Sequence, residues 1–496
     1  MTSRITPAGH ASPLLPSPRA AFLLPVLSLL LYLGPSYASG HLGFPLDDAW
    51  IHQTYARNLA TTGQLAFIPG QPSAGSTSPL WTGLLALGYL LRIDYRLWTY
   101  ALGAVMLGLN AWLAGYLVLT VWPERKLPAL LVSVFLTLEW HLAWAAASGM
   151  ETLLFAALAL AAFVIAPRRA GWLGVCVGLS LLARPDGLTL LPFALMRIVA
   201  HAYPDSQLRG VLKYGFGFGV IFIPYLALNL WLGGSLWPNT FAAKQAEYEI
   251  LRSAPLLARL GQVGILPFIG AQALLVPGMV APIGGWLRSR QWSALLPLGW
   301  AVAFIALYAV RLPVTYQHGR YVMPVIPVLV ALGLGGLSGL LRLRATQMMP
   351  RLLSRAWAAA LGVLALAFWW MGLQAYVRDV RFIENEMVRT ARWVNANTRP
   401  EALIAAHDIG ALGYFGGRKL LDLAGLVSPE VIPFIRDEGR LRDWLNASRP
   451  DHLVTFPSWY PELVAPLDLV YQTETLYRSP KEGENMAVYR WLQEVR

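Results

Sequence analysis

The sequence predicts a polytopic α-helical membrane protein that ends in a small α/β domain. Hydrophobic residues make up 56% of the chain and charged residues only 13%, whereas soluble domains average about 45–50% and about 25%. Many apolar runs approach the ~20 residues that cross a bilayer as a helix. From residue 376 onward the apolar runs shorten to strand length and charges become frequent.

About eleven apolar runs are candidates for transmembrane helices. They lie at 20–38, 97–121, 127–146, 150–166, 170–183, 187–200, 214–232, 263–286, 292–310, 321–341 and 356–373. The fifth and sixth runs are short enough to be tilted or half-buried. The first run has an alternative as a cleaved signal, because Ser36-Tyr37-Ala38 supplies a small-residue cleavage site. We favour a retained helix that packs against the later spans.

Lysine and arginine residues are concentrated in alternate loops, which predicts an orientation. By the positive-inside rule, the loops that carry Arg125-Lys126 and Arg168-Arg169 are cytoplasmic. This assignment requires Ser78–Leu91 to be an interfacial helix and not a span. The net charge of +12 follows from these loops, so we expect no nucleic-acid partner.

The orientation divides the chain into three parts. Residues 1–19 form a cytoplasmic tail, residues 20–375 a membrane domain with a large outer loop at 39–96, and residues 376–496 an extracytoplasmic α/β domain. We therefore expect a multi-pass protein of the cell (inner or plasma) membrane. Cys176 is the only cysteine, which excludes an internal disulfide and a cysteine-based metal site.

The C-terminal part alternates between two kinds of segment. Strand-length apolar stretches occur at 402–406, 420–423 and 452–456. Helical patterns occur at Ile383–Asn397 and Pro433–Asn446, with prolines nearby. This alternation predicts the α/β domain.

Acidic and basic residues gather at the ends of the predicted spans, on the non-cytoplasmic side. Charges at the edge of the hydrocarbon layer are costly unless they serve a polar substrate. We therefore expect an enzyme that acts on a lipid-borne polar head group. The residues are Asp47, Asp48, Glu151, Arg184, Asp186, Lys244, His318 and Arg320.

Two adjacent carboxylates, Asp47 and Asp48, begin the richest segment of the outer loop. Their mutual repulsion tends to raise the pKa of one of them and to make it a better proton acceptor. The alternative is that Asp47 caps the helix that runs through Tyr55 and Leu59. Both interpretations remain open on the residues alone.

A set of short segments then resembles the GT-C glycosyltransferases, and most of all the branch of mycobacterial-type arabinofuranosyltransferases and bacterial enzymes that use polyprenyl-phosphate sugars. Trp50 stands where this family commonly has Tyr, and Gly75-Ser76-Thr77 replaces a commoner Gly-Tyr-Thr. The identity of the transferred sugar therefore cannot be carried over from the family. The segments, in family order, are Asp47–Ile51, Tyr55–Leu59, Thr77–Trp81, Ser148–Thr152, Arg184–Gly187, Pro238–Lys244, His318–Tyr321, His407–Tyr414 and Asp422–Leu426.

The resemblance implies a GT-C-like fold and an inverting hexosyl- or pentosyltransferase. Its donor would be a polyprenyl-phosphate sugar and its acceptor a hydroxyl of an envelope glycan, lipid or protein. Such a donor carries a good leaving group, so the enzyme needs one base and several cations. The resemblance implies Asp47 as the base, Asp48 as the residue that tunes it, and Glu151 as a residue that orients the acceptor or a cation. For Glu151 the alternative is favourable charge at a helix N-terminus.

Cationic residues at the same predicted surface are candidates for binding the donor phosphate. An arginine can form a forked pair of hydrogen bonds with phosphate oxygens. The alternative for Arg320 is contact with lipid head groups through a snorkelling side chain. The candidates are His318, Arg320, Lys244, Arg184 and Arg57.

Acceptor binding is assigned to Tyr55, Trp81, Asp408 and Asp422. Asp408 is a better candidate for a helix N-cap, and the same holds for Asp186. Glu139 and His141 are interpreted as structural residues of an aromatic belt; two positions apart, they cannot face each other on a helix.

We expect no cofactor and no metal cluster, although a divalent cation shared by Asp47 and Glu151 stays open. Two other function classes also remain. One is a transporter or flippase of lipid-linked sugars, which would place charges near the middle of its spans. The other is a non-catalytic envelope assembly subunit.

Overall fold

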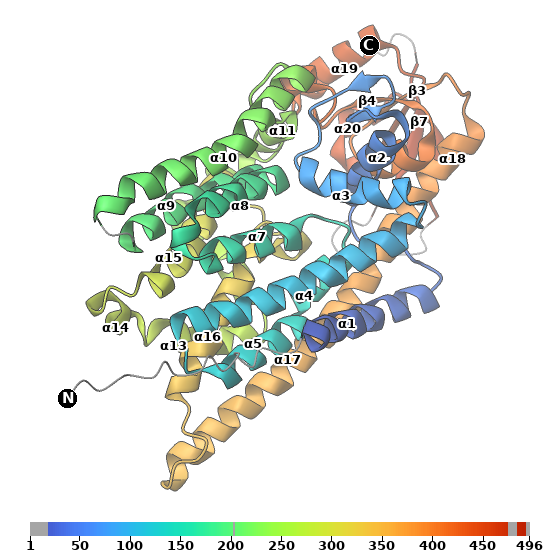
Figure 1. Ribbon diagram of the computed structural model, residues 1–496. Helices are drawn as coiled ribbons and strands as arrows, with labels where there is room; N and C mark the ends of the chain where they lie inside the picture. Colours follow the sequence, from blue (N-terminus) through green and yellow to red (C-terminus); the bar gives the residue numbers. More distant parts are fainter. Residues whose placement is uncertain (1–17, 202–203, 475–483, 493–496) are drawn as a thin grey trace, which may run out of the picture.

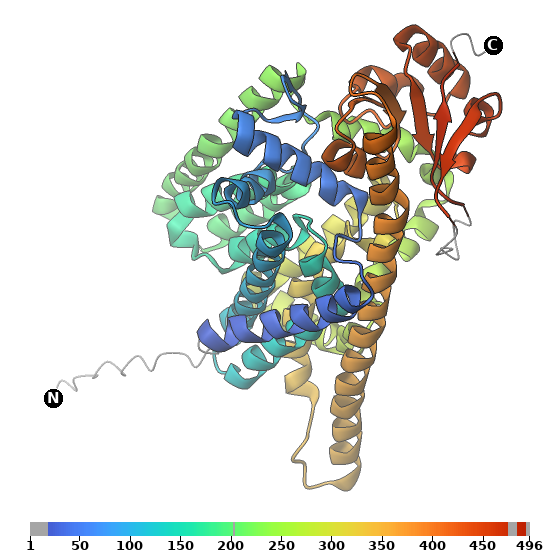
Figure 2. The same ribbon diagram turned by 90° about the vertical axis from the view of Figure 1, so that its right-hand side faces the viewer.

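The computed structural model describes residues 18–201, 204–474 and 484–492. Residues 1–17, which are most of the expected cytoplasmic tail, lie outside this part of the chain. Most of the described chain forms a helical bundle, and a small sheet domain lies at one end of the bundle (Figure 1). The long helix α17 (Met348–Ile383) runs along the bundle and reaches the sheet domain (Figure 2).

Five helical segments of the described residues are long and apolar enough to cross a membrane, and up to eight if each bent helix pair is one span. The prediction of a multi-span helical membrane protein is therefore confirmed, while eleven separate crossings remain a prediction. Besides α17, the long segments contain α4 (Tyr95–Val121), α10 (Pro204–Gly233), α15 (Trp292–Arg311) and α16 (Ile326–Leu340).

The three bent pairs arise where an apolar run is interrupted, with bends of 55°, 117° and 96° in chain order. At the first, Glu139 adopts an extended backbone and its carboxylate accepts a hydrogen bond from the Leu142 amide at 2.9 Å. The helices involved are α5 (Lys126–Leu138) and α6 (Trp140–Ala147), α7 (Thr152–Val164) and α8 (Ala170–Ala183), and α12 (Leu256–Ile265) with α13 (Val276–Val280) and α14 (Ile283–Arg288).

Shorter helices complete the bundle and its end. At about 1.5 Å per residue, the 12-residue α3 is roughly 18 Å long, which is too short for the ~30 Å hydrocarbon core. Its length thus agrees with the expected interfacial helix at Ser78–Leu91. These helices are α1 (Pro18–Ala38), α2 (Asp47–Thr62), α3 (Pro79–Leu90), α9 (Leu190–His201) and α11 (Asn239–Glu247).

The sheet domain contains a five-stranded mixed sheet with the order β4-β3-β5-β7-β6. β3 pairs in parallel with β4 and β5, whereas β7 pairs antiparallel with β5 and β6. The three predicted strands are confirmed, and two others were missed. β6 is mostly exposed, whereas β7 is buried but has only four residues, one of them charged. The strands are β3 (Leu403–Ala406), β4 (Lys419–Asp422), β5 (His452–Thr455), β6 (Asp468–Gln472) and β7 (Ala487–Arg490).

The predicted helix at Ile383–Asn397 is a continuation of α17. A π-helical segment, Glu384–Val388, joins α17 to α18 (Arg389–Asn397). The sheet domain also contains α19 (Glu438–Ser448) and α20 (Pro461–Val464), and a small hairpin of β1 (Ala66–Ile68) and β2 (Gln71–Pro72) follows α2.

Glycines allow several helices of the bundle to approach closely. A β-carbon on Gly103 of α4 would lie 1.9 Å from the carbonyl oxygen of Ala146 on α6, and one on Gly174 of α8 would lie 2.1 Å from that of Tyr214 on α10. Small residues at helix contacts let backbones pack together where lipid offers no hydrophobic driving force.

Candidate active site

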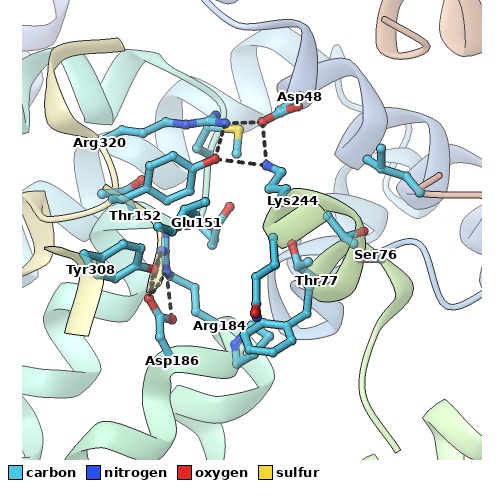
Figure 3. Close-up of a pocket in the computed structure, with 18 of the residues that line it drawn as sticks. Asp48, Ser76, Thr77, Glu151, Thr152, Arg184, Asp186, Lys244, Tyr308 and Arg320 are labelled. Atoms are coloured by element: carbon cyan, nitrogen blue, oxygen red, sulfur yellow. Dashed lines mark hydrogen bonds and ion pairs between the residues drawn. The ribbon is translucent and has the colours of Figure 1, made fainter. Parts of the chain in front are cut away.

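A cavity of about 280 Å³ lies where the bundle meets the sheet domain. It is bounded by α2, α11, α15 and the loops before α7 and after α8, and Leu426 of the sheet domain completes its wall. Figure 3 shows the charged side chains that converge on it. The figure labels Asp48, Glu151, Arg184, Asp186, Lys244 and Arg320, and Arg311 also lines the cavity.

One group of these residues, the Asp48 cluster, consists of Asp48, Lys244, Arg320 and Tyr321. The Asp48 carboxylate accepts hydrogen bonds from Arg320 and, at 3.4 Å, from Lys244 Nζ. Both cations also donate to the Tyr321 hydroxyl at 3.2 Å. Burial alone would raise the pKa of Asp48, but Lys244 and Arg320 hold it far below its ordinary value. Asp48 is therefore a carboxylate at neutral pH.

Arg320 has hydrogen-bonding capacity that the protein leaves unused. Its side chain is only 6% exposed, and Nε and Nη1 have no hydrogen-bond partner among the described residues. A buried N–H without a partner costs free energy. In a side chain that lines a cavity, these groups are suited to an anionic ligand.

The four members of the Asp48 cluster come from three separate segments of the chain. Asp48 belongs to the first turn of α2, and Lys244 lies on α11, which is anchored by a 2.9 Å hydrogen bond from Thr240 Oγ1 to the Gly75 carbonyl. Arg320 follows a turn at Gln317–Gly319. The cluster thus assembles only in the folded protein.

A second group, the Glu151 cluster, forms the other side of the cavity. It consists of His52, Glu151, Arg184, Asp186 and Tyr308. Glu151 lies 3.2 Å from both His52 Nε2 and Arg184 Nη1, while Arg184 also donates to Asp186 at 2.9 Å and to the Tyr308 hydroxyl at 2.7 Å. Burial raises the pKa of Glu151, but the hydrogen bond and charge of His52 and the charge of Arg184 lower it to about 2.

Asp47 does not line the cavity. Its carboxylate accepts hydrogen bonds from the amides of Gly410 at 2.7 Å and Ala411 at 2.8 Å. Of the two interpretations left open for Asp47, capping of its own helix is wrong, because Leu46 is the N-cap residue and both Asp47 oxygens bind amides of the sheet domain. Asp408 was expected to be an N-cap. That expectation is also wrong, because the amides that follow it, those of Gly410 and Ala411, bind Asp47. Burial raises the pKa of Asp47 to about 6, although these two amides lower it.

Several predicted site residues lie outside the cavity and bind protein groups. Arg57 donates to the Tyr414 carbonyl at 2.8 Å and Tyr55 contacts the Ser73 hydroxyl at 2.7 Å. Trp81 donates to the Gly149 carbonyl at 2.8 Å. The Tyr55 contact reaches the loop between α2 and α3, whereas the Arg57 and Trp81 contacts join these helices to the sheet domain and to the turn before α7.

Two further predicted residues also bind protein groups. Asp422 is fully buried and accepts hydrogen bonds from the amides of Ala424 at 2.9 Å and Val427 at 2.8 Å. It fixes the loop that presents Leu426 to the cavity. His318 lies 2.7 Å from Asp379 Oδ2, away from the cavity lining.

The cavity also contains residues that the sequence did not indicate as ligand-binding. Asp186 was expected to be a helix cap, but its carboxylate binds Arg184 and the Tyr308 hydroxyl. Tyr308 lies inside an apolar run, His52 directly follows the Asp47–Ile51 segment, and Tyr321 is the last residue of the His318–Tyr321 segment. Only these positions in or beside the family segments could have identified His52 and Tyr321.

The expectation that the Glu139 and His141 side chains cannot face each other is wrong. Glu139 precedes α6 with an extended backbone, so the two side chains do meet, at 2.7 Å. Both are buried, at 3% and 1% exposure. In the described residues no group of three or more His, Cys, Asp or Glu side chains is placed to hold a metal ion.

Comparison with known families gives a limited sequence match. A family model described as a domain of unknown function (DUF8728) matches residues 374–489. A search of curated proteins finds no match.

Solved structures give a match over nearly the whole chain. ArnT from Cupriavidus metallidurans bound to undecaprenyl phosphate has 14% sequence identity and a TM-score of 0.61, over 95% of this chain and 97% of that one. The Archaeoglobus fulgidus oligosaccharyltransferase in its apo form has 12% identity and a TM-score of 0.61, over 88% of this chain and 69% of that one. The chain therefore has, over nearly its entire length, the fold of the GT-C membrane glycosyltransferases.

Proposed function

We propose that the protein is an inverting glycosyltransferase that moves a sugar from a polyprenyl-phosphate donor to an envelope hydroxyl at the outer face of the cell membrane. The observation that carries the proposal is the pair of cations at the cavity, Arg320 and Lys244, together with the two Arg320 nitrogens that have no hydrogen-bond partner among the described residues. These cations suit a phosphate that gains charge as it leaves. The ArnT relative bound to undecaprenyl phosphate supports this donor class.

Asp48 is the general base in this proposal, in place of Asp47. Asp48 lines the cavity and is ionised, whereas both Asp47 oxygens bind amides of the sheet domain. The acceptor oxygen bonds to the anomeric carbon as the carbon–oxygen bond to the phosphate breaks, and the hydroxyl proton passes to Asp48. Arg320 and Lys244 hold the released polyprenyl phosphate. Contact with that phosphate weakens their hold on Asp48, which raises its pKa as it must accept the proton.

The Glu151 cluster is proposed to bind the hydroxyls of the transferred sugar. Its carboxylates, guanidinium and phenol provide both donors and acceptors on the wall opposite Asp48. Eleven crossings, an extracytoplasmic sheet domain and a boundary near residue 375 complete the proposed topology.

The test begins with mass spectrometry of lipid-linked sugars and envelope glycans in a strain that lacks the gene. Accumulation of a polyprenyl-phosphate sugar would support the donor class and identify the sugar. If no such lipid accumulates and the glycans are unchanged, the donor assignment is wrong.

Complementation of that strain then tests the base. We expect Asp48→Asn to abolish transfer while the protein still folds and binds undecaprenyl phosphate. Asp47→Asn is the matched control, and we expect it to lower stability more than transfer. An Asp48→Asn protein that transfers at the wild-type rate would exclude Asp48 as the base and favour a non-catalytic subunit.

A further inference from the structure

The turn before Arg320 has an unusual backbone. Gln317, His318 and Gly319 have φ values of 53°, 58° and 68° in succession. Only glycine adopts this left-handed region without steric cost, so two of the three residues are strained. Such strain persists only where surrounding contacts hold it, and it is concentrated at functional sites.

Contacts of His318 provide that restraint. Its Nε2 lies 2.7 Å from Asp379 Oδ2 on α17, and the same oxygen accepts a 2.9 Å hydrogen bond from Trp144 Nε1 on α6. The rings of Trp140 and Trp144 meet the imidazole edge-on, with centroids 5.4 and 5.1 Å away. Two helices thus hold one residue of the strained turn.

The restrained turn leads directly to the candidate phosphate-binding side chain. Arg320 follows Gly319 and is bound to Asp48 across the cavity. His318 and Asp379 do not line that cavity. Any effect of this pair on a ligand must therefore pass through the backbone to Arg320.

We propose that Asp379 and His318, together with Trp144, are positioning residues that hold the left-handed turn and so aim the Arg320 guanidinium at the donor phosphate. This inference rests on the proposed function for the identity of the ligand. It replaces the expectation that His318 binds phosphate itself. A misplaced Arg320 would retain its charge but lose the geometry that two parallel hydrogen bonds require.

The first experiment measures hydrogen exchange in the full chain without any ligand. The amides of Gly319, Arg320 and Val322 donate within the turn, to Tyr316, Gln317 and Gly319 respectively. We expect Asp379→Ala to accelerate their exchange, and Arg378→Ala, an exposed neighbour on the same helix, to leave it unchanged. Unaltered exchange in Asp379→Ala would overturn the proposal.

A second substitution distinguishes turn strain from general destabilisation. Because glycine takes a positive φ without cost, Gln317→Gly should restore protection in the Asp379→Ala background. A merely structural loss at α17 would not be repaired by a glycine in the turn. Failure of this rescue would show that strain does not link Asp379 to Arg320.

The second experiment measures affinity for undecaprenyl phosphate, with Arg320→Ala as the reference for loss. Asp379→Ala and His318→Ala should each weaken binding by about tenfold to a hundredfold. The double variant should weaken binding no more than either single variant, because both substitutions remove the same contact between Asp379 and His318. Gln317→Gly should recover the affinity of Asp379→Ala.

The outcomes separate the two proposals. If the wild type does not bind undecaprenyl phosphate, the proposed function fails. Hydrogen exchange at the turn still shows whether Asp379 restrains the turn. If the wild type binds and Arg320→Ala does not, while Asp379→Ala binds normally, the positioning role is wrong and the function stands.

Discussion

Arg320 illustrates how a charged side chain can be buried and still keep unused hydrogen-bonding capacity. One of its nitrogens binds Asp48 and Tyr321, which offsets the cost of burying the charge. The remaining N–H groups have no partner among the described residues. One nitrogen thus holds the side chain in place, and the other two keep hydrogen-bonding capacity that no described residue uses.

A pair of substitutions at Arg320 tests whether the forked geometry or only the charge matters. Arg320→Lys keeps the charge but loses the parallel N–H groups, so we expect donor affinity to fall by about tenfold. Arg320→Ala removes both, and we expect a loss of about a hundredfold or more. Equilibrium binding of undecaprenyl phosphate measures both. Equal affinity of the lysine variant and the wild type would indicate a point-charge interaction.

Asp47 gives the stability of the protein a defined pH dependence. Its pKa is raised from 3.8 to about 6 by burial, so the folded state binds this proton more tightly than the unfolded state. The resulting stability is fully present below about pH 4 and is lost as the pH rises through about 6. About two pKa units correspond to at most about 3 kcal/mol.

Thermal unfolding of wild type and Asp47→Asn from about pH 4 to about pH 7 measures this effect. We expect the stability of the wild type relative to Asp47→Asn to decrease as the pH rises. A difference that is constant or increases across this range would mean that the raised pKa is not that of Asp47.

Helix α2 shows how one element serves two structures. Adjacent residues on a helix point about 100° apart, so Asp47 reaches the sheet domain while Asp48 faces the cavity. The paired acids therefore have separate roles, one in joining the domain and one in the site. A pair of acids in sequence does not imply a pair of acids in the site.

The close packing of α4 against α6 can be tested by substituting the glycine at their contact. Gly103→Ala would place a β-carbon 1.9 Å from the Ala146 carbonyl oxygen, so we expect a loss of about 1–3 kcal/mol of stability or more. Gly83→Ala on α3 is the control, because no atom lies within 4 Å of its β-carbon. It should be neutral or stabilise by about 0.5–1 kcal/mol. Thermal unfolding in detergent that gave equal shifts would contradict this packing.

At the scale of the whole molecule, α17 and the sheet domain complete the site. α17 carries Asp379, which binds the turn before Arg320, and continues through α18 toward the sheet. The sheet domain contributes Leu426 to the cavity and two amides to Asp47. The membrane domain and the sheet domain therefore form one functional unit.

Cysteine labelling tests the orientation of that unit. Cys176 is the only cysteine and is buried, so a Cys176→Ser chain provides a background for single cysteines at exposed positions. We expect cysteines at Gln71 and Asn397 to react with an impermeant maleimide in intact cells, and those at Arg169 and Arg344 only after permeabilisation. Labelling of Gln71 and Asn397 from opposite sides would exclude the proposed topology.

The sequence alone was sufficient for the features that depend on local composition. Apolar runs indicated the multi-span helical class, and short β-strand patterns indicated three strands of the sheet. Charges in short loops indicated Asp48, Glu151, Arg184, Lys244 and Arg320, all of which line the cavity. Hydropathy and charge are properties of neighbouring residues, so they can be recognised without the fold.

The tertiary structure decided which of these residues face one another. It directed Asp48 and not Asp47 into the cavity, placed Tyr308 from an apolar helix beside Asp186, and bound His318 to Asp379. Each of these outcomes depends on the rotation and bending of helices that are distant in sequence. No local pattern encodes that arrangement, because it results from packing across the whole molecule.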